Sequence, residues 1–448
     1  MTSLPWQLAT HPEMYILHAR YAQPAIAMNE AEERRLFSKI AWRLLPVLIL
    51  AYVFNYLDRN NIGFAALTMN REIGLTATQF GRGAGILFLG YCFLEVPSNM
   101  ILYRVGARRW IARIMVSWGI ISATTIFVTG PRSFYLLRFL LGAAEAGFFP
   151  GVAFYLGHWF PAEYRTRVIA WFMVAIPISS VVGGALSGAL LQMNGIAGLA
   201  GWKWLFILEG LPVALLGFVV LNIMTERPED ASWLTERERQ IVRDRVAGEK
   251  RQREVRHLGP ALTDPRVLIL GGVQFGFLVG SYGVGIWLPQ IIKAGNFSNL
   301  QVGFLSSASY GLASIGMIAW AGHVDRGGNK VTSLTLACLL GAIGLVCAVF
   351  ATNFWVSFGW LTVSLVGINA ARGIFFTIPM RFLTGLALAG GLAFINSIGT
   401  AGGFVGPYIF GWLTDRTGSF TAGLAAMSVF LIAAAGLSAS LKLFVTEE

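Results

Sequence analysis

The sequence is poor in charged residues. Asp, Glu, Lys and Arg make up 13% of its 448 residues, about half of the roughly 25% that is usual in soluble domains. Hydrophobic residues account for 55%. A soluble chain of this length would expose too much surface for so few charges. The composition therefore excludes a soluble globular protein and indicates a polytopic membrane protein.

Residues that carry enzyme or metal chemistry are also scarce. The chain has 3 Cys and 5 His, and Cys92, Cys338 and Cys347 lie in apolar runs without the spacing of metal ligands. It has no GxxxxGK[ST] motif that would cradle the phosphates of ATP. We therefore expect no enzyme activity, no cofactor and no metal site, and an energy source other than ATP.

The apolar residues form twelve runs of about 18–25 residues, the length that crosses a bilayer as a helix. The runs lie near residues 41–63, 83–104, 109–129, 133–157, 165–190, 202–224, 266–292, 301–323, 332–351, 354–379, 383–411 and 420–444. They predict an all-α polytopic membrane protein with twelve transmembrane helices. Six runs lie on each side of a polar segment, as in transporters built from two six-helix pseudo-repeats.

A charged segment divides these two groups of runs. We expect an N-terminal cytoplasmic extension (1–40), a first six-helix half (41–224), a charged cytoplasmic linker (225–265) and a second half (266–448). Short basic turns at 103–109 and 323–330 lie at matching places in the two halves and support the repeat. Residues 1–27 resemble neither a signal nor a transit peptide. They are either a flexible extension or an over-long start ahead of Met28.

The distribution of Lys and Arg predicts the orientation in the bilayer. With both termini inside, the inner loops carry 24 Lys and Arg and the outer loops carry 6. This asymmetry predicts a multi-pass plasma-membrane protein, in a bacterium the inner membrane, with both termini in the cytoplasm. The net charge of +11 thus indicates orientation against a lipid bilayer, and no nucleic-acid partner is expected.

Two pairs of charged residues lie deep inside apolar runs, where a charge is costly unless it is paired or faces water. Asp58 and Arg59 lie in the first run, and Arg138 and Glu145 lie two helical turns apart in the fourth. Arginine can grip a carboxylate with two parallel N–H bonds, and a buried carboxyl group can load and release a proton. Asp58 and Arg59 are about 100° apart on a helix, so both could border one polar cavity. Asp58 and Glu145 are candidate proton carriers, and Arg59 and Arg138 are candidate anion anchors. Alternatively, the four are permanent ion pairs that brace the helices.

Further polar residues in the apolar runs extend this candidate site. Arg372 in the tenth run has no acidic neighbour in that run, so an anionic substrate could be its partner; snorkelling to the interface is the alternative. Tyr56, Tyr91 and Asn396 could orient a hydroxylated substrate or could bond between helices.

Two other acidic residues lie near the ends of their runs. We interpret Glu95 as structural, bracing the basic turn from Arg104 to Arg109. Glu209, near the outer end of the sixth run, is interpreted as a gating or structural residue rather than a substrate contact.

The motifs around these residues resemble the anion:cation symporter branch of the major facilitator superfamily. They lie at 55–63, 90–99, 106–110, 138–150, 227–231, 233–235, 396–399, 402–407 and 411–418. The resemblance implies the major facilitator fold and proton-driven uptake of an organic anion: a hydroxy acid, a dicarboxylate such as tartrate, a sugar acid or an aromatic carboxylate. It implies that Asp58 and Glu145 are protonation sites. It also implies that the substrate-site positions are Tyr56, Arg59, Tyr91, Arg138 and Asn396.

Two features depart from that branch or bear on alternatives. Arg372 and Arg381 stand where we expect neutral residues, and Arg372 could select a second carboxylate. The fifth run, with 178–184 reading ISSVVGG, lacks the Gly-Pro that marks drug/proton antiporters. Efflux of an amphipathic compound by proton antiport is the alternative function, and a non-transporting membrane sensor is the alternative from another class.

We expect a transporter that works as a monomer, with protons and a small organic anion as its partners.

Overall fold

The computed structural model describes residues 29–250, 263–383 and 385–444, and the regular elements of this part of the chain are all helices. The helices before the linker are α2 (Glu30–Glu72), α3 (Ala77–Val105), α4 (Ala107–Thr124), α5 (Pro131–Glu145), α6 (Phe148–Trp159), α7 (Ala162–Met173), α8 (Ala175–Leu190) and α9 (Gly201–Ile223). The linker contributes α10 (Glu236–Lys250). The helices after it are α12 (Pro265–Lys293), α13 (Asn299–Asp325), α14 (Lys330–Phe350), α15 (Phe354–Phe375), α16 (Gly385–Thr417) and α17 (Phe420–Ser440).

Every predicted run falls on helix. Within the described residues, 11 helical segments are long and apolar enough to cross a membrane. The predicted run at 383–411 falls on α16, which has 33 residues but is not one of those segments. The fourth and fifth runs are each divided into two helices: Ala146 and Gly147 separate α5 from α6, and Val174 separates α7 from α8. The prediction of an all-α polytopic membrane protein is thus confirmed.

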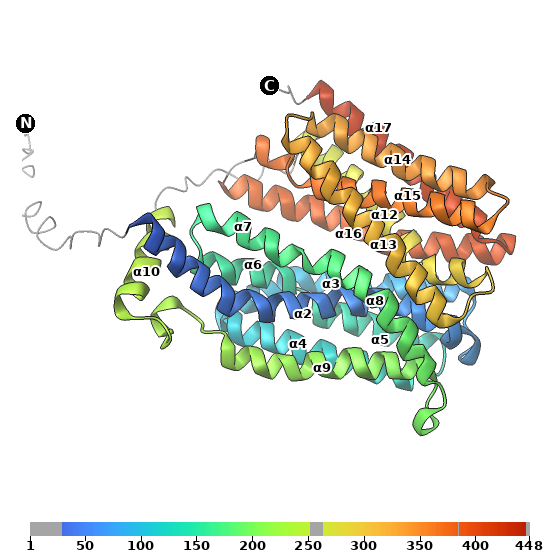
Figure 1. Cartoon of the computed structure of the whole chain (residues 1–448), viewed down its shortest axis with the longest axis horizontal. Helices are drawn as coiled ribbons and strands as arrows, with labels where there is room; N and C mark the ends of the chain where they lie inside the picture. The colour runs from blue at the N-terminus through green and yellow to red at the C-terminus, as the bar shows by residue number, and fades with distance from the viewer. Residues whose placement is uncertain (1–28, 251–262, 384, 445–448) are drawn as a thin grey trace, which may run out of the picture.

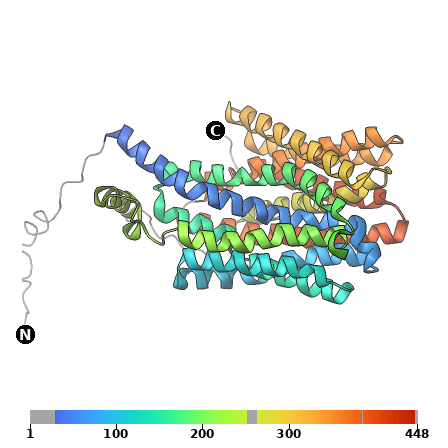
Figure 2. The ribbon, with the colours of Figure 1, turned by 60° about the horizontal axis from the view of Figure 1, so that its bottom comes forward.

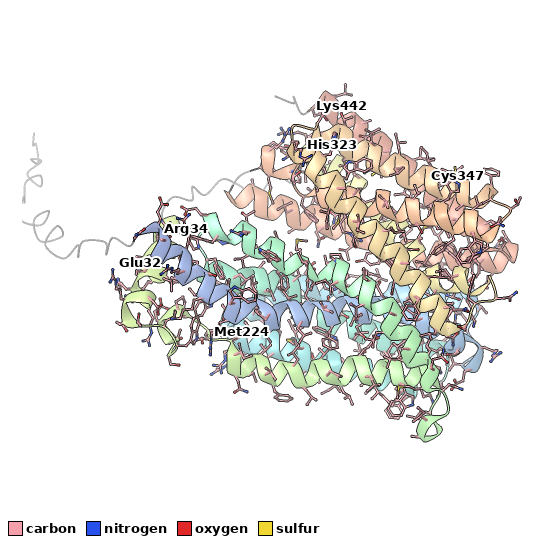
Figure 3. All side chains as sticks on the ribbon, viewed as in Figure 1. Glu32, Arg34, Met224, His323, Cys347 and Lys442 are labelled. Carbon is pink, nitrogen blue, oxygen red and sulfur yellow. The ribbon has the colours of Figure 1, made fainter. Side chains whose placement is uncertain are left out.

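The helices form two bundles, one from α2 to α9 and one from α12 to α17 (Figure 1; Figure 2). Helix α10 packs at one end of the first bundle, and we call this end of the molecule the α10 end. Ion pairs of 2.9 Å hold α10 there, from Lys39 to Glu238 and from Arg245 to Glu33. Figure 3 shows Glu32 and Arg34 at this end and Cys347 toward the opposite end. The charged linker helix therefore contacts the first bundle only through residues at one end.

The two bundles touch through close helix pairs away from the α10 end, which we call the closed end. Helix α3 packs on α16, and α8 packs on α13. A Cβ atom on Gly81 would lie 2.1 Å from the carbonyl oxygen of Pro407, and one on Gly184 would lie 2.7 Å from that of Gly303. Glycine is therefore required at both contacts. Toward the α10 end the bundles diverge (Figure 1).

Substitution of Gly184 is expected to open the closed end. The side chain of Gly184→Leu would overlap Ser307 and Gly303 across the bundles, and overpacking of this kind costs about 1–3 kcal/mol. In a Ser306→Cys reporter without other cysteines, maleimide labelling of this buried position should rise about tenfold or more, since 1.4 kcal/mol is a factor of ten. Gly436→Leu, where a Cβ meets nothing within 4 Å, is the control. Equal labelling in the two variants would contradict the close contact.

Candidate functional site

A cavity of about 130 Å³ lies between the two bundles, near the middle of the helices. Five of the predicted substrate-site residues line it together: Tyr56 and Arg59 from α2, Tyr91 from α3, Arg372 from α15 and Asn396 from α16. They are far apart in the sequence and come from both bundles. The sixth, Arg138, does not line the cavity. We call this the central cavity.

Arg59 is the cation that the first bundle presents to the central cavity. Its guanidinium group lies over the ring of Tyr91, 4.9 Å from the ring centroid, and 5.6 Å from that of Tyr56. Its Nε donates a hydrogen bond of 2.9 Å to Oε2 of Glu145, and its side chain remains 13% exposed while that of Glu145 is 0% exposed. Arg59 thus connects the cavity surface to a carboxylate that the cavity itself does not reach.

Glu145 is the last residue of α5, where the fourth run breaks. Gly147 takes a positive φ of 87° before α6 begins, and Ser98 donates a hydrogen bond of 2.6 Å to the carbonyl oxygen of Ala146 in the break. Oε2 of Glu145 accepts bonds from Arg59 and from Asn55 Nδ2, the latter at 3.0 Å. Its other oxygen, Oε1, is buried without a hydrogen-bond partner among the described residues. One carboxyl oxygen of Glu145 therefore binds the arginine, and the other has no hydrogen-bond partner in the described part of the chain.

Asp58 faces away from the central cavity, so the expectation that it and Arg59 border the same cavity is wrong. One residue step turns a helix by about 100°, and this step points Asp58 into the interior of the first bundle. There Oδ1 of Asp58 accepts hydrogen bonds from Ser122 on α4 and from Asn61, the latter at 3.1 Å. Oδ2 is buried without a hydrogen-bond partner in the described part of the chain.

Arg138 is 1% exposed and lies behind the cavity wall with Asp58 and Glu145. It is close enough to both carboxyl groups to interact with them electrostatically. Its Nε and Nη1 have no hydrogen-bond partner among the residues described. In this conformation Arg138 is therefore placed to balance the buried carboxylates rather than to touch a molecule in the cavity.

Arg372 is the cation that the second bundle presents to the central cavity. Its Nη2 donates a hydrogen bond of 2.7 Å to Oγ of Ser281. Within the described ranges it forms no ion pair. Arg381, the other unexpected arginine, is exposed and does not line the cavity.

Asn396 is the predicted site residue on α16. Its Oδ1 accepts a hydrogen bond of 3.2 Å from Gln274 Nε2.

The structure adds cavity residues that the sequence analysis missed. Gln274 and Tyr282 on α12 line the central cavity, and Tyr282 packs on Phe88 of α3 with ring centroids 4.3 Å apart. These residues are uncharged, so they do not stand out in an apolar run. The recurrence of polar groups along α12 at 274, 281 and 282 is the signal that could have found them.

Glu95 does not brace the basic turn as expected. It accepts a long bond of 3.4 Å from the hydroxyl group of Tyr91, four residues earlier on the same helix. The turn is held instead by Glu226, whose carboxylate accepts bonds from the backbone N–H groups of Ala107 (2.6 Å) and Arg108 (3.0 Å) at the start of α4. A carboxylate at this place is favoured by the positive end of the helix dipole.

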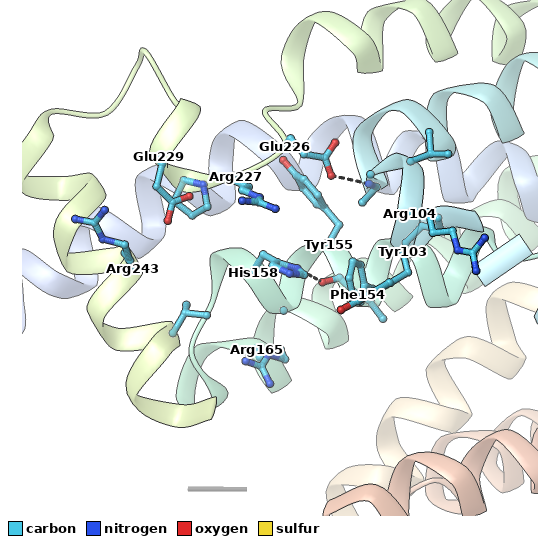
Figure 4. A pocket seen from close by; sticks show the side chains of 18 residues that line it. Tyr103, Arg104, Phe154, Tyr155, His158, Arg165, Glu226, Arg227, Glu229 and Arg243 are labelled. Atoms are coloured by element: carbon cyan, nitrogen blue, oxygen red, sulfur yellow. Dashed lines mark hydrogen bonds between the residues drawn. The ribbon is translucent and has the colours of Figure 1, made fainter. Parts of the chain in front are cut away.

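A larger hollow of about 1070 Å³ lies beside Glu226 at the α10 end. Figure 4 shows Arg104 and Arg243 at opposite sides of it, pointing apart, with Arg227 and His158 between them. A small anion could not contact Arg104 and Arg243 at once in this arrangement. The central cavity is therefore the better candidate for a substrate site.

In the described part of the chain no cluster of three or more His, Cys, Asp or Glu side chains could hold a metal ion.

The central cavity thus lies between two helix bundles, with an arginine at its wall that binds a buried carboxylate. The family model described as "Major Facilitator Superfamily" matches residues 48–407. A protein of Agrobacterium vitis named "Putative tartrate transporter" is 48% identical, over 93% of this chain and 93% of that protein. A "Quinolone resistance transporter" of Acinetobacter baumannii is 38% identical, over 89% of this chain and 93% of that protein.

The fold resembles that of solved transporters. A bacterial homologue of the human lysosomal transporter Spinster, in an inward-facing and occupied conformation, superposes with a TM-score of 0.73 at 17% identity, covering 90% of this chain and 97% of that one. The chain belongs to the major facilitator superfamily. It is a multi-pass membrane protein and a secondary transporter, and not an enzyme. The alternative of a non-transporting sensor is therefore wrong.

Proposed function

We propose that the protein takes up a small organic anion together with protons. The observation that carries this proposal is the hydrogen bond of 2.9 Å between Arg59 at the cavity wall and Glu145 behind it. A carboxylate of a substrate and the carboxylate of Glu145 would compete for the same guanidinium group. Protonation of Glu145 removes its charge and releases Arg59 to the substrate, so anion binding and proton binding favour each other.

The two arginines of the central cavity support a substrate with two acidic or strongly polar ends. Arg59 belongs to the first bundle and Arg372 to the second, and both line the same cavity. A dicarboxylate could bridge them, with Asn396 beside it for a hydroxyl group. This fits the name of the Agrobacterium vitis relative, which refers to tartrate. We infer a hydroxy dicarboxylate as the preferred substrate class.

Removal of Arg372 is expected to change this preference. Arg372→Ala should weaken dicarboxylate transport about 10–100-fold and affect monocarboxylates much less, because a hydrogen bond to a charged group contributes about 1.5–3 kcal/mol. Uptake of paired mono- and dicarboxylates of similar size measures the ratio. Arg381→Ala, which changes an exposed arginine outside the cavity, is the control. An unchanged ratio of dicarboxylate to monocarboxylate uptake would mean that Arg372 does not bind the second carboxylate.

The orientation and the division of the chain are part of the proposal. The excess of Lys and Arg predicted for the inner side supports a cytoplasmic location of both termini and of the α10 end. In a bacterium the protein would lie in the inner membrane. We keep 1–40, 41–224, 225–265 and 266–448 as the proposed extension, halves and linker, with the monomer as the working unit. The prediction for residues 1–27 lies outside the described residues.

Transport by purified protein in lipid vesicles tests the proposed function. With an acidic outside buffer, vesicles should accumulate a labelled hydroxy dicarboxylate above its outside concentration, and a protonophore should abolish this accumulation. Vesicles with the protein but without a pH gradient are the control. Equal accumulation with and without the gradient would contradict proton coupling.

Proton-driven efflux is the second candidate, favoured by the relative named as a quinolone resistance transporter. The size of the central cavity argues against it, since 130 Å³ is below the roughly 300–1,000 Å³ of pockets for drug-sized ligands. The same vesicles separate the two functions. Antiport would be supported by two results together. A quinolone should move into vesicles that have an acidic interior, and a carboxylate should not accumulate under the opposite gradient.

A further inference from the structure

A third buried carboxyl group, Glu209 on α9, lies beside the predicted proton carrier Asp58. Glu209 is 1% exposed. Its Oε2 accepts a hydrogen bond of 2.9 Å from Asn61 Nδ2, and the same nitrogen donates a bond of 3.1 Å to Asp58 Oδ1. One amide group therefore bridges the two acidic side chains. The mechanism proposed above does not use Glu209.

The surroundings of Glu209 contain no countercharge in the part of the chain that the structure describes. Helix α9 packs on α2, α4 and α8. From α8, Ser187 donates a bond of 3.3 Å to Oε1 of Glu209. The facing residues of α4, Gly119 and Ser122, carry no charge. Asp58 on α2 is the titratable group that interacts with Glu209 electrostatically, and no cation among the described residues does so.

Two carboxylates in one buried site cannot both ionise at low cost, because like charges repel and burial penalises each charge. Such a pair holds one proton between its members and titrates as a unit. Arg138 is close enough to interact with both Asp58 and Glu145, so it connects the pair to the carboxylate that binds Arg59. Asp58 and Glu209 are thus placed as one pair, in which the negative charge of either group favours protonation of the other.

The pair also adjoins a second, small cavity on the side of the closed end. This cavity lies between the bundles and is lined by Asn61, Ser187, Ser306 and Tyr310. Its volume of about 10 Å³ is close to the minimum that holds one water molecule. Asn61 and Ser187, the two hydrogen-bond donors to Glu209, both line it. Glu209 is thus separated by one side chain, Asn61 or Ser187, from this small cavity, which is distinct from the central cavity.

We propose that Asp58 and Glu209, bridged by Asn61, form a shared proton-binding site that is loaded from the small cavity through the hydroxyl group of Ser187. This inference rests on the proposed proton coupling and adds a site to it. Protons reach Glu209 from the small cavity, and Asp58 passes the charge change to Arg138 and Glu145. Glu145 then controls Arg59 at the central cavity. The proton path would thereby run through the first bundle, separate from the path of the anion.

The pH profile of transport in Glu209→Gln tests this site. Gln keeps the shape of Glu and its bond to Asn61, but it removes a negative neighbour of Asp58. Asp58 then ionises more readily, and more acid is needed to load it. The pH of half-maximal proton-driven uptake should therefore fall by about one unit, a tenfold change in proton affinity. Exchange of substrate without a pH gradient should stay within about twofold of the wild type, since the variant does not alter the central cavity.

Glu72→Gln is the matched control. Glu72 lies on α2 toward the closed end and accepts a bond of 2.7 Å from Trp202 on α9, outside the network of Asp58. Its pH profile should match that of the wild type. An unshifted profile in Glu209→Gln would overturn the shared site while leaving the proposed function intact. If the wild type itself shows no proton-driven uptake, the proposed function is refuted instead.

Ser187→Ala keeps the inference testable if Glu209→Gln does not fold. It removes the hydroxyl group that stabilises ionised Glu209, so the pair holds its proton more tightly. The pH of half-maximal uptake should therefore rise, opposite to the change in Glu209→Gln. No shift in a folded Ser187→Ala protein would overturn the proposal.

Discussion

Glu145→Gln is expected to abolish proton-driven accumulation of the anion and to preserve exchange. Glutamine is uncharged at every pH, so it cannot hold Arg59 with a negative charge and cannot take up or release a proton. Arg59 is then permanently available to the anion. In vesicles, labelled substrate should still exchange against unlabelled substrate, whereas an acidic outside buffer should give no accumulation above equilibrium.

The control for this variant is Glu72→Gln, whose carboxylate accepts a bond from Trp202 outside the Glu145 network. It should accumulate substrate like the wild type. Full proton-driven accumulation by a folded Glu145→Gln protein would remove Glu145 from the coupling mechanism. Loss of both accumulation and exchange would contradict the proposed release of Arg59.

Arg59→Lys is expected to lose most of the transport activity although it keeps the positive charge. Lysine cannot form the two parallel bonds that a guanidinium group offers to a carboxylate. It also loses the flat face that lies over Tyr91. Since a charged hydrogen bond is worth about 1.5–3 kcal/mol, apparent affinity for the anion should fall about 10–100-fold. Initial uptake rates over a range of substrate concentrations measure this change.

Arg82→Lys provides a matched comparison, because Arg82 also lies over a tyrosine ring, 5.3 Å from the centroid of Tyr135, but is exposed and outside the cavity. It should transport like the wild type. Equal affinities in Arg59→Lys and Arg82→Lys would show that Arg59 does not contact the anion.

The helices could be predicted from the sequence because hydrophobic length is a local property. A run of about 20 apolar residues satisfies its backbone only as a helix in lipid, and every predicted run falls on helix. The breaks inside the fourth and fifth runs could not be predicted in this way. The break at Gly147 depends on a positive φ and on a bond from Ser98 of another helix, and neither leaves a mark on hydropathy.

The charged residues of the site could be predicted because charge is rare inside apolar runs. Their arrangement could not, because it depends on which way each helix is turned. Arg59 faces the central cavity, whereas Asp58, its neighbour in sequence, faces α4. The cavity residues Gln274 and Tyr282 were missed because they are uncharged and do not stand out in an apolar run.

The two bundles contribute different groups to the proposed mechanism. The first bundle holds the buried carboxyl groups, Arg59 and one side of the central cavity. The second bundle contributes Arg372 and Asn396 to the opposite side. Contacts between glycine-rich faces, such as Gly184 on Gly303, let the bundles approach closely at the closed end. A change of charge at Glu145 would thus alter how the anion binds, and the bound anion contacts both bundles.

The most direct test of this account is the number of protons that the purified protein takes up when it binds the anion. Calorimetric titrations in buffers of different ionisation enthalpy measure this number. If Arg59 alternates between Glu145 and the anion, binding should take up about one proton in a pH range where Glu145 is ionised in the free protein, and affinity should fall as the pH rises. Glu145→Gln should bind without that proton and without that pH dependence. Proton-independent binding by the wild type would contradict the central claim.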